Sequence, residues 1–297
     1  LGLGGDQVLI NGRRITGKEN EGNSQLSRIP ANQVQRIEII RGTSGELDVR
    51  GATQLINIVL LETDTRSSFT YEVNADHLHD GEVKPGAKLS LSGQSGRFDY
   101  LISGETEPRW ANRKGFESSF LANGTKNDTV SRRTITDQQP TTMSSNIGYQ
   151  FSENDVAHLN FQYNQNDAPE ELDRVITDYL TSPPTIKSQF EDISNESDFW
   201  ELGGDYEHTF RGGNRWRGLF IINQKKDDRT RERFDLNDSN QKDIFLKTFN
   251  QYEEEIFRTS YSMDLSERQD LEFGIERAKT TLESTLRLGL ASQGAPS

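Results

Sequence analysis

The stretch QVQRIEIIRGTSGELDVRGATQLINIVL, residues 33–60, places two apolar runs on either side of a segment that contains three glycines. Val, Ile and Leu favour strands, and glycine permits the backbone angles of a tight turn. The first run is therefore predicted to be a strand that leads into a turn bracketed by Gly42 and Gly45. The second run, residues 53–62, is apolar on both faces and is predicted to be a fully buried strand.

The residues before this stretch predict a small compact unit. DQVLINGRRI, residues 6–15, reads as a strand, an Asn11–Gly12 turn of type I′ and the start of a returning strand. A short helix or turn, capped by Asn23 or Ser24, then leads through Ile29–Pro30 into the first strand of the quoted stretch. Residues 1–66 are thus predicted to form a small α+β unit.

The whole chain is far more polar than this unit. Only 31% of its 297 residues are hydrophobic and its mean hydropathy is −0.80, values that approach those of disordered chains. It nevertheless has 15 Phe, 8 Tyr and 3 Trp, and disordered chains are poor in aromatic residues. The low average is therefore expected to hide an alternation of apolar and polar residues.

The charge is unevenly divided. Residues 1–66 have as many basic as acidic residues, so the net charge of −13 falls entirely in residues 67–297. So acidic a chain argues against nucleic acid as a partner, because binding to phosphates needs clustered Lys and Arg. There is no Cys, hence no disulfide framework, and no apolar run approaches the length of a membrane-spanning helix or of a signal-peptide core.

Residues 67–297 alternate between apolar and polar side chains many times over. SSFTYEVNAD, for example, puts Phe69, Tyr71 and Val73 on one face and Ser68, Thr70 and Glu72 on the other. The same period predicts nine strands, centred on residues 69–75, 87–91, 98–102, 147–151, 157–163, 200–206, 216–222, 257–265 and 271–275. TLRLGL, residues 285–290, is a possible tenth strand.

The connections between these strands are of two kinds. Short polar turns are predicted at residues 93–96, 152–155, 211–214 and 266–269, whereas three connections are long: residues 107–140, 167–197 and 225–251. Short turns at one end and long loops at the other are typical of transmembrane β-barrels. Aromatic residues near the strand ends, Phe151, Trp200, Phe210 and Trp216, are predicted to form interfacial girdles. The alternative is a soluble β-sandwich, which seldom tolerates such loops.

The first unit carries a family resemblance. The succession Val8–Arg13, Ile29–Pro30, Val34–Gly42, Ser44–Gly45, Gly51 and Ile56–Ile58 resembles the second half of the plug domain of TonB-dependent outer-membrane receptors, over residues 6–61. The resemblance implies a plug (residues 1–66) inside an antiparallel barrel of about 22 strands, of which residues 67–297 supply the first part. It departs from the family pattern at Thr43 and at residues 49–54, so the geometry of that turn is left open.

The resemblance also implies a function. Such receptors bind a scarce extracellular solute, of siderophore, cobalamin or oligosaccharide type, and a periplasmic TonB protein pulls on the plug to import it. We therefore expect a monomer in the outer membrane of a Gram-negative bacterium, in contact with lipid and with neither cofactor nor enzymatic activity. The TonB box and first plug half are not in this sequence, so we expect it to be a piece of a longer receptor. A passive or adhesive barrel and a soluble β-rich binding module remain the alternatives.

Plug arginines in this family commonly pair with barrel glutamates, and Arg36 and Arg41 occupy the matching motif, with Glu38 between them. Residues 36 and 38 share one face of a strand, so Arg36 and Glu38 can also neutralise each other. A charge enclosed in a lumen is costly without a partner. Glu72, Glu105, Glu201 and Glu272 all lie on predicted inward faces, and the sequence does not choose among them. A salt bridge internal to the plug, with no part in gating, is the alternative.

Other candidate residues have weaker support. Arg14, Lys18 and Asn20 lie in a plug segment that is predicted to face outward towards solute. EPRWANRK, with Arg109 and Trp110, and DDRTRERFD, residues 227–235, are suited to gripping an anionic ligand, although ordinary loop salt bridges are the favoured reading. Acidic loops repel anions at long range and so favour a neutral or cationic solute.

Two histidines, His77 and His79, stand two residues apart between aspartates, which raises the question of a metal site. Two His do not make a site by themselves, and the other two His are far away in the sequence, so a solvated strand tip is predicted and no metal. The scattered His and the absence of Cys also leave no nucleophile–base pair for catalysis.

Overall fold

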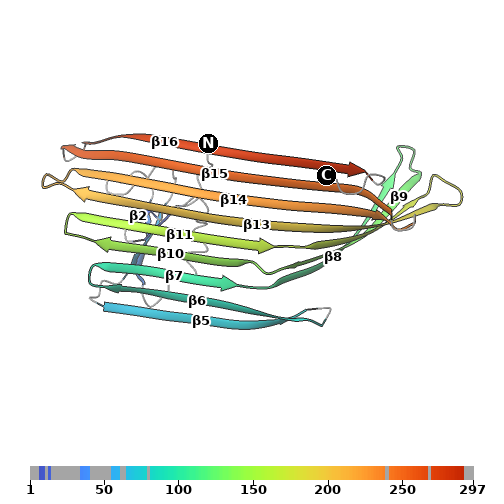
Figure 1. Cartoon of the computed structure of the whole chain (residues 1–297), viewed down its shortest axis with the longest axis horizontal. Helices are drawn as coiled ribbons and strands as arrows, with labels where there is room; N and C mark the ends of the chain where they lie inside the picture. The colour runs from blue at the N-terminus through green and yellow to red at the C-terminus, as the bar shows by residue number, and fades with distance from the viewer. Residues whose placement is uncertain are drawn as a thin grey trace.

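The computed structural model describes residues 7–10, 13–14, 34–40, 55–60, 65–78, 81–237, 241–266 and 269–290. These residues form β-strands joined by short turns, and they build two sheets (Figure 1). Among them no helix is long and apolar enough to cross a membrane. The short helix or turn predicted after Asn23 lies outside the described residues.

The small sheet has the strand order β2-β1-β4-β3. Its strands are β1 (Gln7–Ile10), β2 (Arg13–Arg14), β3 (Val34–Ile40) and β4 (Leu55–Leu60). β1 pairs with β2 antiparallel, as the Asn-Gly turn predicts, and with β4 in parallel. Asn57 and Ile58 point to opposite faces of β4 and each is only 4% exposed, which confirms that this strand is buried on both faces.

The large sheet contains all nine strands that the alternation predicts. In the described part of the chain they follow one another in the order β16-β15-β14-β13-β11-β10-β7-β6-β5, each antiparallel to its neighbours. Their bounds are β5 (Thr65–His77), β6 (Val83–Ser95), β7 (Phe98–Thr106), β10 (Thr141–Gln150), β11 (Asp155–Asp167), β13 (Thr185–Thr209), β14 (Arg215–Asp235), β15 (Gln241–Ser266) and β16 (Gln269–Leu290). TLRLGL is the end of β16 and not a tenth strand. The fold is thus mainly β, with a partial antiparallel barrel.

Short turns join these strands at one end, on the left in Figure 1. Gly96 and Gly213 have positive φ angles of 58° and 84°, a conformation that glycine adopts without the penalty that a side chain imposes. The turn at residues 151–154 is bonded to the neighbouring hairpin, because the backbone N–H of Thr209 donates to the carbonyl of Asn154. The predicted turn around residues 267–268 lies outside the described residues.

In the part of the chain that the structure describes, the three long connections consist mostly of strands, contrary to the prediction. They contain β8 (Arg109–Phe120), β9 (Lys126–Gln138) and β12 (Glu170–Asp178), and they lengthen β13, β14 and β15. β12 pairs with both β9 and β13, and β8 pairs with β9. We call this part of the sheet the extension: residues 109–138, 170–178, 185–198, 225–235 and 241–252. It lies at the right of Figure 1.

The extension escaped prediction because its strands carry no apolar stripe. Backbone ladders and cross-strand polar pairs hold polar strands together where both faces meet water, so period-two hydrophobicity is not needed. The strand β9, for example, reads KNDTVSRRTITDQ, and Thr, Ser and Arg there alternate without an apolar face. Such strands are invisible to a search for alternating hydrophobic residues.

One face of the nine-strand sheet is apolar and exposed. Phe69, Tyr71, Leu89, Leu91, Ile102, Leu159, Phe161, Phe257 and Phe273, for instance, are each 39–70% exposed. We call this the apolar face. Along β13 its stripe runs from Trp200 to Phe210, the residue that follows the strand, and on β15 it runs from Phe257 to Leu265. These lengths are close to the 9–11 residues that a tilted strand needs to cross a bilayer. Asp198 and Glu255 then follow on the same face.

Aromatic rings gather at the short-turn end of the apolar face. Ring centroids lie 4.8 Å apart for Tyr149 and Phe151, 5.8 Å for Phe210 and Tyr261, and 5.6 Å for Tyr261 and Phe273. Trp216 packs in the same region against Tyr206, at 5.8 Å. The predicted girdle positions Phe151, Phe210 and Trp216 are therefore close together, whereas Trp200 lies at the other end of its stripe.

Candidate functional site

In the small sheet, the carboxylate of Glu38 is bonded to neighbours within the same sheet. Arg36 Nε donates to Glu38 Oε1 at 2.7 Å, and Asn57 Nδ2 on the neighbouring strand β4 donates to Glu38 Oε2 at 2.7 Å. The Asn57 amide, followed by the Arg36 guanidinium, lowers the pKa of Glu38. Arg36 and Glu38 thus share a face, as predicted, and form a pair within the plug. Arg41 lies outside the described residues.

The other weakly supported candidates are not brought together. Lys18, Asn20 and His79 lie outside the described residues, and Arg14 is placed only as part of β2. Arg109 and Trp110 begin β8 and, as consecutive strand residues, point to opposite faces. Arg109 is exposed, and His77 ends β5. Within the described ranges no group of three or more His, Cys, Asp or Glu is arranged to hold a metal ion.

The face opposite the apolar face, which we call the polar face, carries the four predicted glutamates. Glu72, Glu105, Glu201 and Glu272 all alternate with apolar-face residues on their strands. The structure separates them by burial, because Glu201 is only 3% exposed whereas Glu72 and Glu272 are exposed. Glu201 therefore becomes the strongest candidate among the four.

Glu254, which the sequence analysis missed, lies close to Glu201. Asn223 of β14 is the cross-strand neighbour of both glutamates, and its Nδ2 lies 3.4 Å from a carboxylate oxygen of each. Thr280 of β16 also donates to Glu254, at 3.3 Å, and Glu254 is 8% exposed. Continuing the alternation backwards from Phe257 would have placed Glu254 on the polar face. The two carboxylates form what we call the wall pair, Glu201 and Glu254.

A groove of about 750 Å³ opens on the apolar face and is not part of this polar surface. Small residues on adjacent strands, Ala157, Gly204 and Gly218, form its floor, and Tyr149 and Phe257 are among the larger residues around it. It offers aliphatic and aromatic contacts and faces away from Glu201. We therefore do not assign it to a polar solute.

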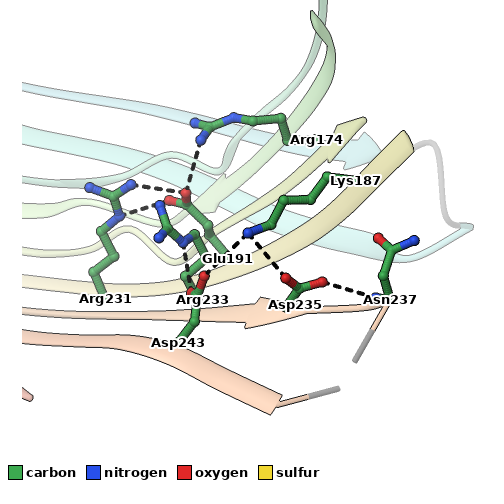
Figure 2. A network of polar contacts seen from close by, with 8 residues as sticks. All are labelled: Arg174, Lys187, Glu191, Arg231, Arg233, Asp235, Asn237 and Asp243. Carbon is green, nitrogen blue, oxygen red and sulfur yellow. Dashed lines mark hydrogen bonds and ion pairs between the residues drawn. The ribbon is translucent and has the colours of Figure 1, made fainter. Parts of the chain in front are cut away.

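The extension contains a network of ion pairs around Glu191, shown in Figure 2. Glu191 of β13 is 1% exposed, and both its oxygens accept from Arg231 of β14, at 2.7 and 2.9 Å. Arg174 of β12 approaches the same carboxylate from the other side, at 3.5 Å. Glu191 raises the pKa of Arg231 further above its ordinary value. Glu191 therefore ties three neighbouring strands together.

Further pairs extend this network to the end of the hairpin (Figure 2). Arg233 Nε donates to Asp243 at 2.7 Å, and Lys187 lies 3.1 Å from Asp235. Lys187 and the backbone N–H of Asn237 lower the pKa of Asp235. The salt bridges expected in DDRTRERFD are thus present, but they join strands and not loop residues.

Comparison with known proteins finds a family match at the start of the chain. Residues 1–54 match the family model of the TonB-dependent receptor plug domain. No curated protein matches the chain.

Two solved structures are similar at low identity. One is P. aeruginosa FpvA bound to a heterologous pyoverdine and iron, with 8% identity and a TM-score of 0.36 over 96% of this chain and 47% of that one. The other is the copper transporter OprC, with 10% identity and a TM-score of 0.24 over 95% of this chain and 52% of that one. This chain thus spans about half the length of either structure. Both TM-scores lie below 0.5, so neither likeness carries an argument about this chain.

The plug match covers β1, β2 and β3 of the small sheet and ends just before β4, and the strands that follow form a partial antiparallel barrel with one apolar and one polar face. Residues 1–54 are thus similar to the plug domain of TonB-dependent receptors, and a partial antiparallel barrel follows them in the chain.

Proposed function

We propose that the chain is part of a receptor in the outer membrane of a Gram-negative bacterium, which imports a scarce extracellular solute with energy delivered by a periplasmic TonB protein. The observation that carries this function is the combination of a plug unit with a sheet whose exposed face is apolar over about one bilayer thickness. Members of this family are transporters and not enzymes. A porin or an adhesin has no need of a plug.

The solute is proposed to be of siderophore, cobalamin or oligosaccharide type. It would meet the extension and the outward segments of the plug first, among them Arg14, Lys18, Asn20, Arg109 and Trp110. The domain boundary is proposed near residue 66, since β4 ends at Leu60 and β5 begins at Thr65.

The plug is proposed to be locked to the wall through its arginines. Glu38 already accepts from Arg36 and Asn57 within the small sheet, which leaves Arg41 as the better candidate to reach the wall. The wall pair is proposed to receive it, because both carboxylates lie on the polar face and are strongly buried, and a guanidinium group pairs well with a carboxylate in such a place. Release of such a contact would accompany opening of the lumen.

Transport and locking are tested separately in the full-length receptor. Deletion of the TonB protein is expected to abolish solute uptake while leaving solute binding intact, and uptake that persists without TonB would indicate a passive barrel. Arg41→Ala and Glu254→Gln are each expected to raise TonB-independent leakage of a small solute several-fold. Glu272→Gln, an exposed glutamate on the same polar face, is the matched control. Unchanged leakage in both variants would exclude the lock.

A further inference from the structure

Five arginines share one face of the extension. They are Arg132 on β9, Arg174 on β12, and Arg229, Arg231 and Arg233 on β14. Arg132 lies directly opposite Arg174 in the strand register, and Arg174 and Arg231 both contact Glu191. The three arginines of β14 follow at every second residue, about 7 Å apart. This set, which we call the arginine face, continues the polar face of the barrel strands.

The carboxylates on this face do not balance the arginines. Glu191 forms ion pairs with both Arg174 and Arg231. Asp243 pairs with Arg233, and Glu117 pairs with Arg132 at 2.9 Å. Within the described residues Arg229 has no hydrogen bond or ion pair, and its same-face neighbour Asp227 is engaged by Ser197 and Lys225. Lys187 and Lys225 lie on the same face and pair with Asp235 and Asp227, so that seven cationic groups meet five carboxylates in this cluster, in a chain whose net charge is −13.

The arrangement has an energetic cost in the free protein. Like charges directly opposite in neighbouring strands destabilise a sheet, and this is the position of Arg132 and Arg174. The side chain of Arg132 lies across Gly115 of β8, where a Cβ would come within 2.7 Å of its Nε. Because Gly115 has no side chain, the guanidinium group of Arg132 can lie across it on the arginine face.

The arginines remain accessible to a solute. The side chains of Arg132, Arg231 and Arg174 are 51%, 32% and 25% exposed, and Arg229 is exposed as well. A guanidinium has five N–H donors, and each of these groups uses only some of them on protein carboxylates. Planar donors of this kind match carboxylate and phosphate oxygens in pairs.

We propose that the arginine face binds a multivalent anion that carries carboxylate or phosphate groups. The anion supplies the negative charge that the local carboxylates lack and bridges β9, β12 and β14. The acidic composition of the chain does not prevent this, because salt screens its field beyond about 8 Å whereas the arginines act at contact distance. If the receptor function proposed above holds, the imported solute is itself an oxyanion or is escorted by one.

Binding is measured on the detergent-solubilised full-length protein with two probes, citrate and pyrophosphate, at constant ionic strength with chloride as the reference anion. One or both probes are expected to raise the unfolding temperature and to bind in calorimetry. Citrate binding alone indicates a carboxylate ligand, and pyrophosphate binding alone indicates a phosphate ligand. Equal effects of both probes and chloride would overturn the proposal.

The residues are tested by Arg229→Gln, which removes one charge from an exposed side chain without breaking any ion pair among the described residues. Affinity for the probe is expected to fall about tenfold, as for one charge-assisted hydrogen-bond donor. Lys226→Gln is the matched control, because Lys226 is exposed on the same strand but points to the opposite face. Gly115→Ala, which displaces Arg132, is expected to weaken binding as well.

Equal losses in the Arg229 and Lys226 variants would reduce the effect to general electrostatics and contradict the proposal, and so would unchanged affinity in the Arg229 and Gly115 variants. Neither measurement involves TonB. Probe binding without energised uptake would therefore support the anion site but contradict the transport function. Energised uptake without probe binding would support the transport function but contradict the anion site.

Discussion

At the scale of single residues, burial distinguishes side chains that look alike in the sequence. Glu191 and Glu196 both lie in β13, but Glu191 is 1% exposed and bound by arginines, whereas Glu196 is exposed. A buried carboxylate is tolerated only when it is paired and hydrogen-bonded. The consequences of substitution therefore depend on the partners of each charge more than on the charge itself.

Arg231→Leu leaves Glu191 with Arg174 alone, at 3.5 Å. We expect the extension to lose about 3 kcal/mol of stability against local opening, because one partner of a buried pair is missing. Hydrogen exchange of the β13 and β14 amides, followed by mass spectrometry, measures this loss. The double variant Glu191→Leu/Arg231→Leu should regain most of it, and Arg229→Leu should change exchange little. If the single and double variants open equally, Glu191 is not held by Arg231.

Asp235 predicts a pH dependence at the tip of the extension. Lys187 and the Asn237 N–H lower its folded pKa, so folding favours the ionised form. The resulting stabilisation is fully present above the unfolded value, near 3.9, and is lost as pH falls through the folded pKa. Protease cleavage near residue 237 should therefore increase in acid. Asp235→Asn should cleave faster at neutral pH and lose part of this pH dependence, and an unaltered pH profile would argue against the contribution.

At the scale of elements, each of the nine barrel strands presents one apolar and one polar face, which the proposed function assigns to lipid and to the lumen. The stripes end where charged residues such as Asp198 and Glu255 follow, so strand length and polarity together define a band. The extension strands continue past this band without a break in the ladder, as β13 and β14 show over Gln189 to Thr209. One continuous strand can thus serve two environments.

Phe161 and Gln162 test the two faces at adjacent positions of β11. Phe161 is 40% exposed on the apolar face, and Gln162 points to the polar face. Phe161→Lys is expected to destabilise the barrel in lipid vesicles by about 2 kcal/mol, since charges on the lipid face are costly within the membrane. Gln162→Lys should cost much less. Urea titrations of the protein folded into vesicles compare the two, and equal costs would contradict the assignment of faces.

At the scale of the whole molecule, the polar average composition conceals a large exposed apolar surface, whose contact with water is unfavourable. The exposed stripes of Phe, Tyr, Leu and Ile run over neighbouring strands of one sheet and together exceed the scattered apolar residues of ordinary protein surfaces. The polar face and the extension contribute much of the low mean hydropathy of −0.80. Global composition therefore describes this class of protein poorly.

The same surface predicts how the protein behaves in solution. Removal of detergent or lipid is expected to aggregate it, because the stripes have no protein partner among the described residues. Sedimentation before and after detergent removal measures this directly. A protein that stayed monomeric and folded without detergent would favour a soluble β-rich module and would remove the basis of the receptor function.

Local pattern determined the nine barrel strands, because each carries apolar residues at alternate positions on one face, and that alternation can be read from consecutive residues. It also placed Arg36 beside Glu38 and four glutamates on the polar face. Only the tertiary structure decided that the long connections are strands, that Glu254 joins Glu201 at Asn223, and that arginines from β9, β12 and β14 meet on one face. These features depend on cross-strand register, which sets neighbours far apart in the chain and leaves no periodic trace in polar segments.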